Sequence, residues 1–155
     1  MNTLSFFVGK NRYAIDTQNV IEIVPWVTLR ELPHAPEYVA GMLNYRGIVV
    51  PVIDLTRLMT GTPSKRILST RIVLVSYPGK NDKEHTLGIL TEQIAAIDDP
   101  EKKRFVDPGI TVADAPYLGN ISMDEKETTQ MVRIEALLPE ALRETLFTEQ
   151  ETPGS

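Results

Sequence analysis

The apolar run at residues 48–55, IVVPVIDL, restricts the fold of this chain more than any other segment. It does not alternate polar and apolar residues as a half-buried strand does, so both of its faces are expected to be covered. Pro51 cannot donate a hydrogen bond to a sheet ladder, which places it at a sheet edge or at a bulge. The run therefore predicts a strand that lines a small, bent barrel with one face and meets a second layer with the other.

Short strands separated by turns are expected along the rest of the chain, a pattern typical of small barrels and sandwiches. Gly9 and Asn11 suit the turn between the first two strands, and Arg46-Gly47 suits a reversal before the apolar run. Residues 78–83, PGKNDK, read as a solvated turn. Strands are predicted at residues 4–8, 12–15, 20–24, 41–45, 48–53, 70–77, 86–90, 94–97 and 130–134.

Few helices are expected, and all of them are short. Asp54 is a suitable N-cap for residues 55–59, and Asp99 before Pro100 is a suitable start for residues 100–104. Pro139 opens a C-terminal helix over residues 139–148, in which Leu138, Leu142 and Leu146 share one stripe. The polar end, residues 149–155, is expected to be a flexible tail.

The two halves of the chain resemble each other in sequence. Residues 13–23, YAIDTQNVIEI, align with residues 87–97, LGILTEQIAAI, and two later pairs of segments follow in the same order: 35–42 with 115–121, and 52–55 with 133–137. Such an internal repeat predicts two related half-barrels in tandem. We expect a single domain over residues 1–148, with a first barrel at about 12–66, a second at about 67–138, and an N-terminal strand that either barrel could share.

Composition excludes several classes of protein. The 155 residues suit one domain, and an apolar content of 42% is enough for a core. A net charge of −5 argues against a nucleic-acid binder and against a polybasic membrane anchor. The chain has no cysteine, no apolar run of the roughly 18 residues that span a membrane, and no secretion signal at its start. We expect a cytoplasmic globular protein without direct membrane insertion.

No pattern of residues predicts a reaction centre. His34 is expected in a proline-rich loop and His85 in a charged turn, without the partners that a metal site needs, and both read as solvated loop residues. Gly9-Lys10 lacks the rest of a phosphate-binding loop, and no nucleophile elbow is present. Trp26 reads as core or rim packing, with an interface anchor as the alternative. By elimination the sequence favours a binding module that is not an enzyme and has no metal or cofactor.

Residues 20–55 resemble the hallmark of CheW-type chemotaxis coupling proteins. The matching parts are the strand VIEI at 20–23, the proline-containing loop PHAPEYVAG at 33–41, the G-x-x-N-x-R-G turn at 41–47 and the run VPVIDL at 50–55. The second half fits the family as well, through TLGILTEQIAAI and the closing strand pair and helix. The likeness extends from about residue 3 to residue 138.

This resemblance implies a mainly β fold of two SH3-like barrel subdomains with a few short helices and no catalytic activity. It implies an adaptor that couples chemoreceptors to a CheA-type histidine kinase, whose regulatory domain is homologous and joins the adaptor barrel to barrel, with other CheW-like domains in rings. The receptor's hairpin tip would insert a helix between the two barrels. Two alternatives stay open: a CheW-like adaptor of a non-flagellar chemosensory pathway, and a small-ligand-binding barrel.

Site residues follow from the same resemblance. Glu22 and Arg46 match a charged pair across neighbouring strands at the barrel rim, where such a pair serves specificity more than affinity. Asn44 and Gly41 match the motif too, although turn geometry explains Gly41 and Gly47 equally well. Receptor or kinase contacts are thus predicted at Glu22, Arg46, Asn44, Gly41, Val20, Tyr45, Gly88 and Ile89.

Three of these assignments carry a competing interpretation. Val20 reads first as core packing. Gly88 and Ile89 match groove positions of the second barrel, but a small residue before an apolar one is a common strand pattern. Tyr45 stands where the family usually has leucine, and its larger, polar-tipped side chain is expected to alter which partner is accepted.

Overall fold

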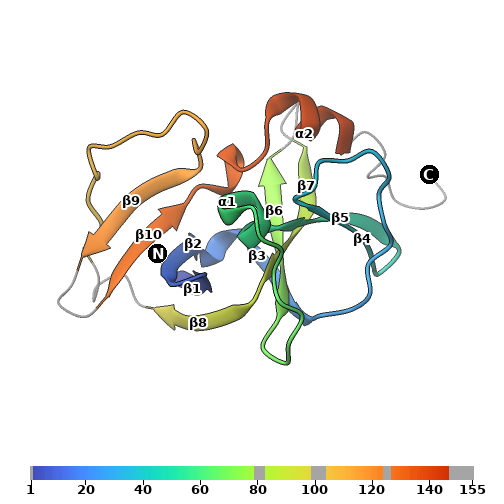
Figure 1. Ribbon diagram of the computed structural model, residues 1–155, viewed down its shortest axis with the longest axis horizontal. Coiled ribbons are helices and arrows are strands. Elements are labelled where there is room, and N and C mark those ends of the chain that lie inside the picture. Colours follow the sequence, from blue (N-terminus) through green and yellow to red (C-terminus); the bar gives the residue numbers. More distant parts are fainter. Residues whose placement is uncertain (1, 79–82, 99–103, 124–126, 147–155) are drawn as a thin grey trace.

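Two five-stranded sheets make up most of the molecule, and the expected fold class is confirmed. The computed structural model describes residues 2–78, 83–98, 104–123 and 127–146. Sheet A has the order β8 (Gln93–Asp98), β1 (Thr3–Val8), β2 (Asn11–Asp16), β10 (Thr128–Val132), β9 (Leu118–Met123). Sheet B has the order β3 (Val20–Pro25), β6 (Arg71–Pro78), β7 (Glu84–Thr91), β5 (Ile48–Asp54), β4 (Val39–Tyr45). The two sheets lie side by side (Figure 1).

The helices are short and lie near the junction of the sheets. Helix α1 (Leu55–Thr60) lies between them, and α2 (Glu140–Leu146) lies above sheet B (Figure 1). Asp54 caps α1 as predicted, because its carboxylate accepts a hydrogen bond from the Arg57 amide at 3.2 Å. Single 3-10 turns occur at Thr17–Asn19 and Ile134–Ala136. The helix predicted at residues 100–104 and the tail predicted at 149–155 lie outside the described residues, apart from Arg104.

The sheets share one topology. In each, an antiparallel hairpin (β1–β2 or β6–β7) has an antiparallel strand on one side (β8 or β3) and a parallel strand on the other (β10 or β5). The last strand (β9 or β4) is antiparallel to its neighbour and forms the far edge. Strands β1 to β5 and strands β6 to β10 are therefore two copies of one unit.

The aligned segments make the same backbone contacts in both copies. Arg30 and Met42 exchange hydrogen bonds of 3.0 and 2.7 Å, and Val106 and Ile121 exchange bonds of 2.9 and 2.8 Å. The Asp54 amide donates to the Tyr38 carbonyl at 2.7 Å, and the Arg133 amide donates to the Tyr117 carbonyl at 2.7 Å. The first equivalence coincides with the sequence similarity between residues 35–42 and 115–121. The second makes Asp54 correspond to Arg133, so the alignment of 52–55 with 133–137 is shifted by two residues from the structural one.

The division of the chain between the sheets differs from the barrel ranges expected at 12–66 and 67–138. Each unit contributes its hairpin to one sheet and its next three strands to the other, so sheet B takes β6 and β7 from the second unit. Strand β2, expected in the first barrel, pairs with β1 and β10 in sheet A. The expected ranges assumed that each sequence repeat forms its own barrel. In the structure, the hairpin of each unit is hydrogen-bonded into a sheet with three strands of the other unit.

One hydrophobic core joins the two sheets. Leu4, Phe6 and Ile15 of sheet A pack with Val73 and Ile89 of sheet B, and all are nearly or completely buried. Leu137 and Leu138 extend this core, and Leu142 and Leu146 of α2 pack against it, which agrees with the predicted helix stripe. A second core fills the interior of sheet B and comprises Val50, Val52, Ile72, Leu74 and Leu90. Burial of both faces of β5 explains why its sequence does not alternate.

The sequence placed Pro51 at a sheet edge or at a bulge, but β5 runs between β7 and β4 and is not an edge strand. The bulge in the β4–β5 pair lies nearby, between Val39 and Gly41, rather than at Pro51. The pairing partner of Pro51 is Met42, whose amide and carbonyl bond to Arg30 on the opposite side. The Met42–Pro51 pair is therefore a non-hydrogen-bonded pair. The backbone nitrogen of Pro51, which carries no hydrogen, faces β7. Pro51 lies one residue before the first pair between β5 and β7, which is Val52 with Gly88. Proline is tolerated here because the ladder needs no donor from it.

Candidate functional site

Three side chains meet at the seam of sheet B: Glu22 of β3, Tyr45 at the end of β4, and Arg46 in the following turn. The Tyr45 hydroxyl donates a hydrogen bond to a Glu22 carboxylate oxygen. The same oxygen, Oε2, lies 3.6 Å from Arg46 Nη2, and the Arg46 guanidinium carbon lies 5.0 Å from the centre of the Tyr45 ring. We call these three residues the Glu22 cluster.

The sequence suggested that Glu22 and Arg46 pair across neighbouring strands, but the Glu22 cluster joins strands that are not neighbours. Strands β3 and β4 are the two opposite edges of sheet B. Their side chains can meet only because the sheet curves until its edges approach each other, as in a small barrel. The hydrogen bond and the ion pair therefore lie on the closing seam of the barrel.

The turn that presents Arg46 has a defined geometry. Tyr45 pairs with Ile48, and the two residues between them, Arg46 and Gly47, have φ angles of 52° and 84°. Positive φ at both positions is the type I′ hairpin turn, which favours glycine. Asn44 stabilises this turn, because its Oδ1 accepts a hydrogen bond from the Gly47 amide at 2.9 Å. Asn44 and Gly47 thus place the Arg46 side chain, which is 76% exposed, at the rim.

The electrostatics of the cluster favour a neutral phenol beside a carboxylate. The pKa of Tyr45 is raised above its ordinary value, first by its hydrogen bond to Glu22 and then by partial burial, while the charge of Arg46 opposes this. The Glu22–Arg46 ion pair is solvent-exposed, so its contribution to stability is about 0–1 kcal/mol. The arrangement fixes side-chain orientation at the rim and offers a charged surface for recognition.

Gly41 has a structural reason to be glycine. Its φ is 146°, and a Cβ at this position would lie 2.5 Å from the Arg30 carbonyl oxygen. The close approach follows from the bridge between Arg30 and Met42 that covers the β4 edge. Val20 is partly buried against the core between the sheets, in agreement with a packing role.

Gly88 and Ile89 are not available for direct contact with a partner, which corrects their prediction as groove residues. Ile89 is only 1% exposed and belongs to the core between the sheets. Gly88 is buried in β7, where a Cβ would lie 2.9 Å from Val52 Cγ2. The small-then-apolar pattern here reflects close packing of β7 on β5.

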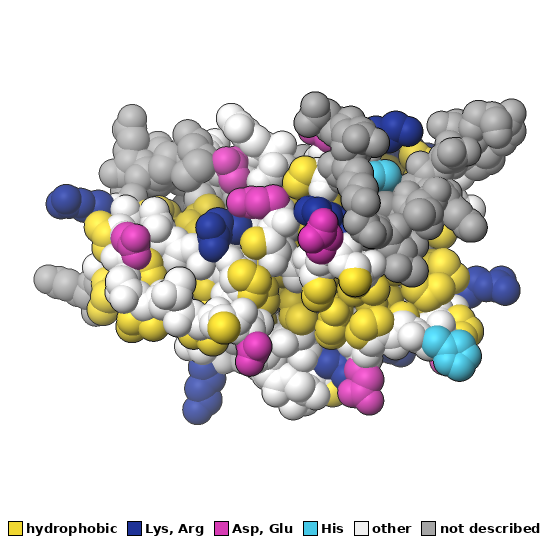
Figure 2. Space-filling model, turned by 90° about the horizontal axis from the view of Figure 1, so that it is seen from above, with side chains coloured by type: hydrophobic (Ala, Val, Ile, Leu, Met, Phe, Trp, Pro, Cys, Tyr) yellow, Lys and Arg dark blue, Asp and Glu magenta, His cyan; other side chains and the backbone are white. Residues whose placement is uncertain are grey.

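An exposed apolar strip on β3 was not predicted from the sequence. Ile21 and Ile23 are 47% and 38% exposed and lie on the face of β3 opposite to Glu22. In sheet A, Ile97 occupies the position equivalent to Ile23 and is exposed too. The segment VIEIV has apolar residues on both faces of the strand, so its pattern alone does not tell which face is covered. Apolar side chains also gather on the surface seen from above (Figure 2).

Features of a reaction centre are not found in the described ranges. They contain no group of three or more His, Cys, Asp or Glu residues that could hold a metal ion. His34 is exposed in a loop, while His85 lies within β7 opposite Tyr77 rather than in a turn. No helix in the part of the chain that the structure describes has the length and apolar character needed to cross a bilayer.

The sequence matches a family model and several curated proteins. A family model described as "CheW-like domain" matches residues 2–142. The chain is 28% identical over 94 residues to the chemotaxis protein CheW of Rhizobium meliloti, covering 61% of this chain and 57% of the relative. It is 37% identical over 75 residues to CheW of Helicobacter pylori, covering 48% and 45%. The aligned part thus spans about half the length of these curated relatives.

A solved structure shows the same fold. The scaffolding protein TtCheW from Thermoanaerobacter tengcongensis superposes with a TM-score of 0.73, covering 88% of this chain and 90% of that one at 21% sequence identity. At this identity the likeness concerns the fold. Two sheets of five strands with few helices are therefore an architecture already known in a solved protein.

Proposed function

Because this chain belongs to the CheW-like domain family, we propose that it is a non-catalytic adaptor of a chemotaxis or chemosensory pathway. Its partners would be the cytoplasmic hairpin tip of a chemoreceptor and the regulatory domain of a CheA-type histidine kinase. The protein would act in the cytoplasm, associated with the membrane only through its receptors. Other CheW-like domains could join it in rings.

The observation that carries this proposal is the family match over residues 2–142, which includes every described strand. The names of the matched relatives, chemotaxis proteins, and of the scaffolding protein TtCheW agree with an adaptor role.

The Glu22 cluster is our proposed recognition surface on sheet B. Arg46 is held at the rim by a turn that leaves its guanidinium mostly in solvent, and Glu22 is partly exposed beside it. The opposite face of β3 presents the exposed side chains of Ile21 and Ile23. Helix-in-groove recognition uses both kinds of group, since apolar contacts give affinity and charges give register.

The test is capture by defined partners. Purified receptor cytoplasmic domain and kinase regulatory domain are each immobilised, and the binding of the wild-type chain is compared with that of Arg46→Glu and Glu22→Arg. We expect both variants to fold and to lose about tenfold or more in affinity for at least one partner, because like charges at a complementary interface are repulsive. Arg30→Glu is the matched control, since Arg30 is an exposed arginine of the same region outside the cluster.

Unchanged capture by both charge-reversed variants would exclude the Glu22 cluster as the recognition surface. Failure of the wild-type chain to bind either domain would remove the adaptor proposal itself. The alternative of a small-ligand-binding barrel gains no support from the interior of sheet B, where Val50, Val52, Ile72, Leu74 and Leu90 are at most 1% exposed and pack together. Small barrels are usually filled by side chains in this way.

A further inference from the structure

The loop between α1 and β6 exposes two apolar side chains. Leu68 is 97% exposed and Ile67 is 54% exposed. The loop extends below the two sheets in the view of Figure 1, away from α2. Single exposed leucines are common on protein surfaces and need no explanation by themselves. This pair stands out because the loop around it is tightly held and carries unpaired positive charge.

Hydrogen bonds fix the loop on both sides of these residues. Asp54 accepts bonds from the Ser64 hydroxyl at 2.6 Å and from the Ser64 amide at 2.9 Å. The Thr70 hydroxyl donates to the Lys65 carbonyl at 2.6 Å and accepts from the Ile67 amide at 2.9 Å. The Arg71 guanidinium donates to the Leu68 carbonyl at 2.6 Å. Leu68 therefore stays exposed in a pre-organised loop, which lowers the entropy cost of binding.

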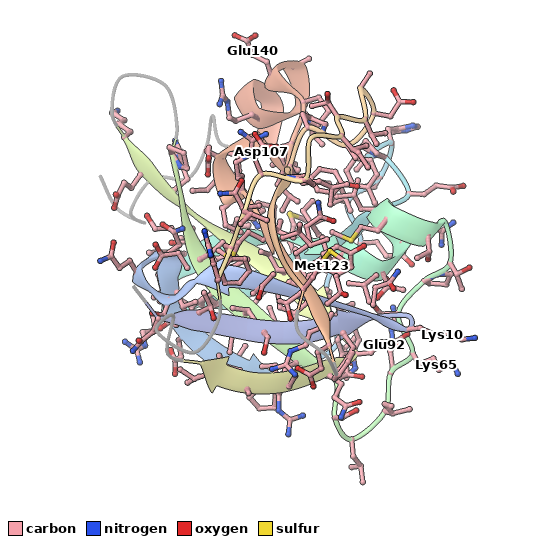
Figure 3. The ribbon with its side chains drawn as sticks, turned by 90° about the vertical axis from the view of Figure 1, so that its left-hand side faces the viewer. Lys10, Lys65, Glu92, Asp107, Met123 and Glu140 are labelled. Atoms are coloured by element: carbon pink, nitrogen blue, oxygen red, sulfur yellow. The ribbon has the colours of Figure 1, made fainter. Side chains whose placement is uncertain are left out.

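The loop is also anchored through Glu92, which lies between β7 of sheet B and β8 of sheet A. This residue accepts a hydrogen bond from the Lys65 amide at 2.7 Å on its side chain and one from the Ser69 hydroxyl at 2.7 Å on its carbonyl. Lys10, Lys65 and Glu92 meet at one corner of the molecule (Figure 3). The loop thus has a firm base on both sheets, and its exposed tip is rigid.

Arg66 is oriented by stacking on Trp26. Its guanidinium carbon lies 4.5 Å from the centre of the Trp26 ring, and Trp26 itself packs against the interior core of sheet B. Among the described residues the Arg66 guanidinium makes no hydrogen bond or ion pair. A guanidinium that stacks on an aromatic ring and keeps its donors unpaired is prepared for a carboxylate, which it can bind through two parallel hydrogen bonds.

A hollow brings the apolar and charged groups together. It is lined by Pro25 and Trp26 on one side and by the loop from Arg66 to Arg71 on the other. Lys65, Arg66 and Arg71 make this region basic, although the whole chain has a net charge of −5. The local charge is thus opposite to that of the protein, so the region favours an acidic partner.

We propose that Trp26, Arg66, Ile67 and Leu68 form a second docking surface, which binds a protein segment that carries a carboxylate next to an apolar side chain. The carboxylate would pair with Arg66, and the apolar side chain would lie on Trp26 and Leu68. A lipid surface fits less well. Trp26 is packed against the core and cannot enter a bilayer, Glu92 lies among the cations, and the cluster is smaller than most lipid-binding basic clusters.

This surface is separate from the Glu22 cluster. Trp26 lies four residues beyond Glu22, a distance of about 13 Å along an extended chain. The proposal therefore does not depend on the adaptor function, and the variants that test the two surfaces differ.

The test uses Trp26, the only tryptophan of the chain, as a fluorescent reporter. The full-length protein is titrated with a capped peptide of sequence Gly-Leu-Glu-Leu-Gly and with the same peptide carrying Gln for Glu. We expect a saturable change in Trp26 emission with the Glu peptide, and about tenfold weaker binding of the Gln peptide because the charged hydrogen bond is lost. Vesicles of phosphatidylserine and phosphatidylcholine form a third arm.

Variants are measured by titration calorimetry, because Arg66 itself affects Trp26 emission. Arg66→Gln and Leu68→Ser should each weaken binding of the Glu peptide about tenfold, whereas Arg104→Gln, an exposed arginine elsewhere, should not. Equal affinity for the Glu and Gln peptides, binding of neither, or equal loss in Arg104→Gln would each overturn the proposal. A response to vesicles without a response to the Glu peptide would overturn it in favour of a lipid surface.

Discussion

The Tyr45 hydroxyl donates a hydrogen bond to Glu22, and this bond connects the first and last strands of sheet B. Leucine at position 45 could not make it. In sheet A the position equivalent to Glu22 is Ala96, whose side chain offers no acceptor. The two sheets share a topology but differ at this seam, so a partner can distinguish them by charge.

The Glu22–Arg46 pair is expected to matter little for folding. Its N···O separation is 3.6 Å and the Arg46 side chain is 76% exposed, so solvent screens the attraction. A double-mutant cycle with Glu22→Gln and Arg46→Gln should give a coupling free energy of about 0–1 kcal/mol in urea unfolding. A coupling several times larger would mean that the pair is structural, and the charge-reversed variants would then no longer report on recognition alone.

Alkaline pH should destabilise the fold through the tyrosines. The pKa values of Tyr13, Tyr38, Tyr77 and Tyr117 are raised above 10.0, in each case mainly by burial, and that of Tyr45 is raised mainly by its bond to Glu22. A raised pKa means that the folded state holds these protons more tightly than the unfolded state does. The resulting stability is fully present below pH 10 and is lost as the pH rises through the higher folded-state values.

The measurement is the free energy of unfolding at a series of pH values, with phenolate absorbance recorded in parallel. We expect a flat profile near neutral pH and a fall above pH 10.0, with ionisation of the buried phenols accompanying unfolding. Tyr45→Phe should make the fall shallower, because it removes one of the contributing groups. Ionisation of all tyrosines at their ordinary pKa in a chain that remains folded would contradict this account.

Gly41→Ala should be strongly destabilising. The added Cβ would lie 2.5 Å from the Arg30 carbonyl oxygen, a contact that the backbone of two paired segments must move to relieve. We expect a loss of roughly 2–4 kcal/mol in the free energy of unfolding. Gly9→Ala is the matched control, because Gly9 also has positive φ, 60°, but no atom lies within 4 Å of the added Cβ. Its cost should be only about 1 kcal/mol; equal losses would disprove the steric explanation.

Local patterns predicted much of the fold. The β1–β2, β4–β5 and β6–β7 hairpins, the α1 cap and the α2 stripe depend on residues close together in sequence, such as Gly47 or Asp54, and were recognised. Strand β9 was not among the predicted strands. The repeat was visible because equivalent residues make equivalent contacts. The exchange of hairpins was not, since β7 pairs with β5 of the other unit rather than with β10 of its own, and this is a long-range choice. Burial of Gly88 and Ile89 follows from that pairing and was missed with it.

The exchange of hairpins makes its own prediction, which concerns fragments of the chain. If each repeat folded by itself, residues 1–66 and 67–155 would be independent units. In the structure, β6 and β7 lie between β3 and β5, so fragment 1–66 lacks the centre of sheet B and fragment 67–155 lacks the β1–β2 hairpin of sheet A. Each fragment alone should be unfolded by circular dichroism, and an equimolar mixture should regain the native spectrum.

Fragment 20–91, which contains all five strands of sheet B and its interior core, should retain more β-structure than either half, although it exposes the face that packs on sheet A. Stable, native-like spectra for 1–66 and 67–155 measured separately would show that the sheets do not exchange hairpins in solution.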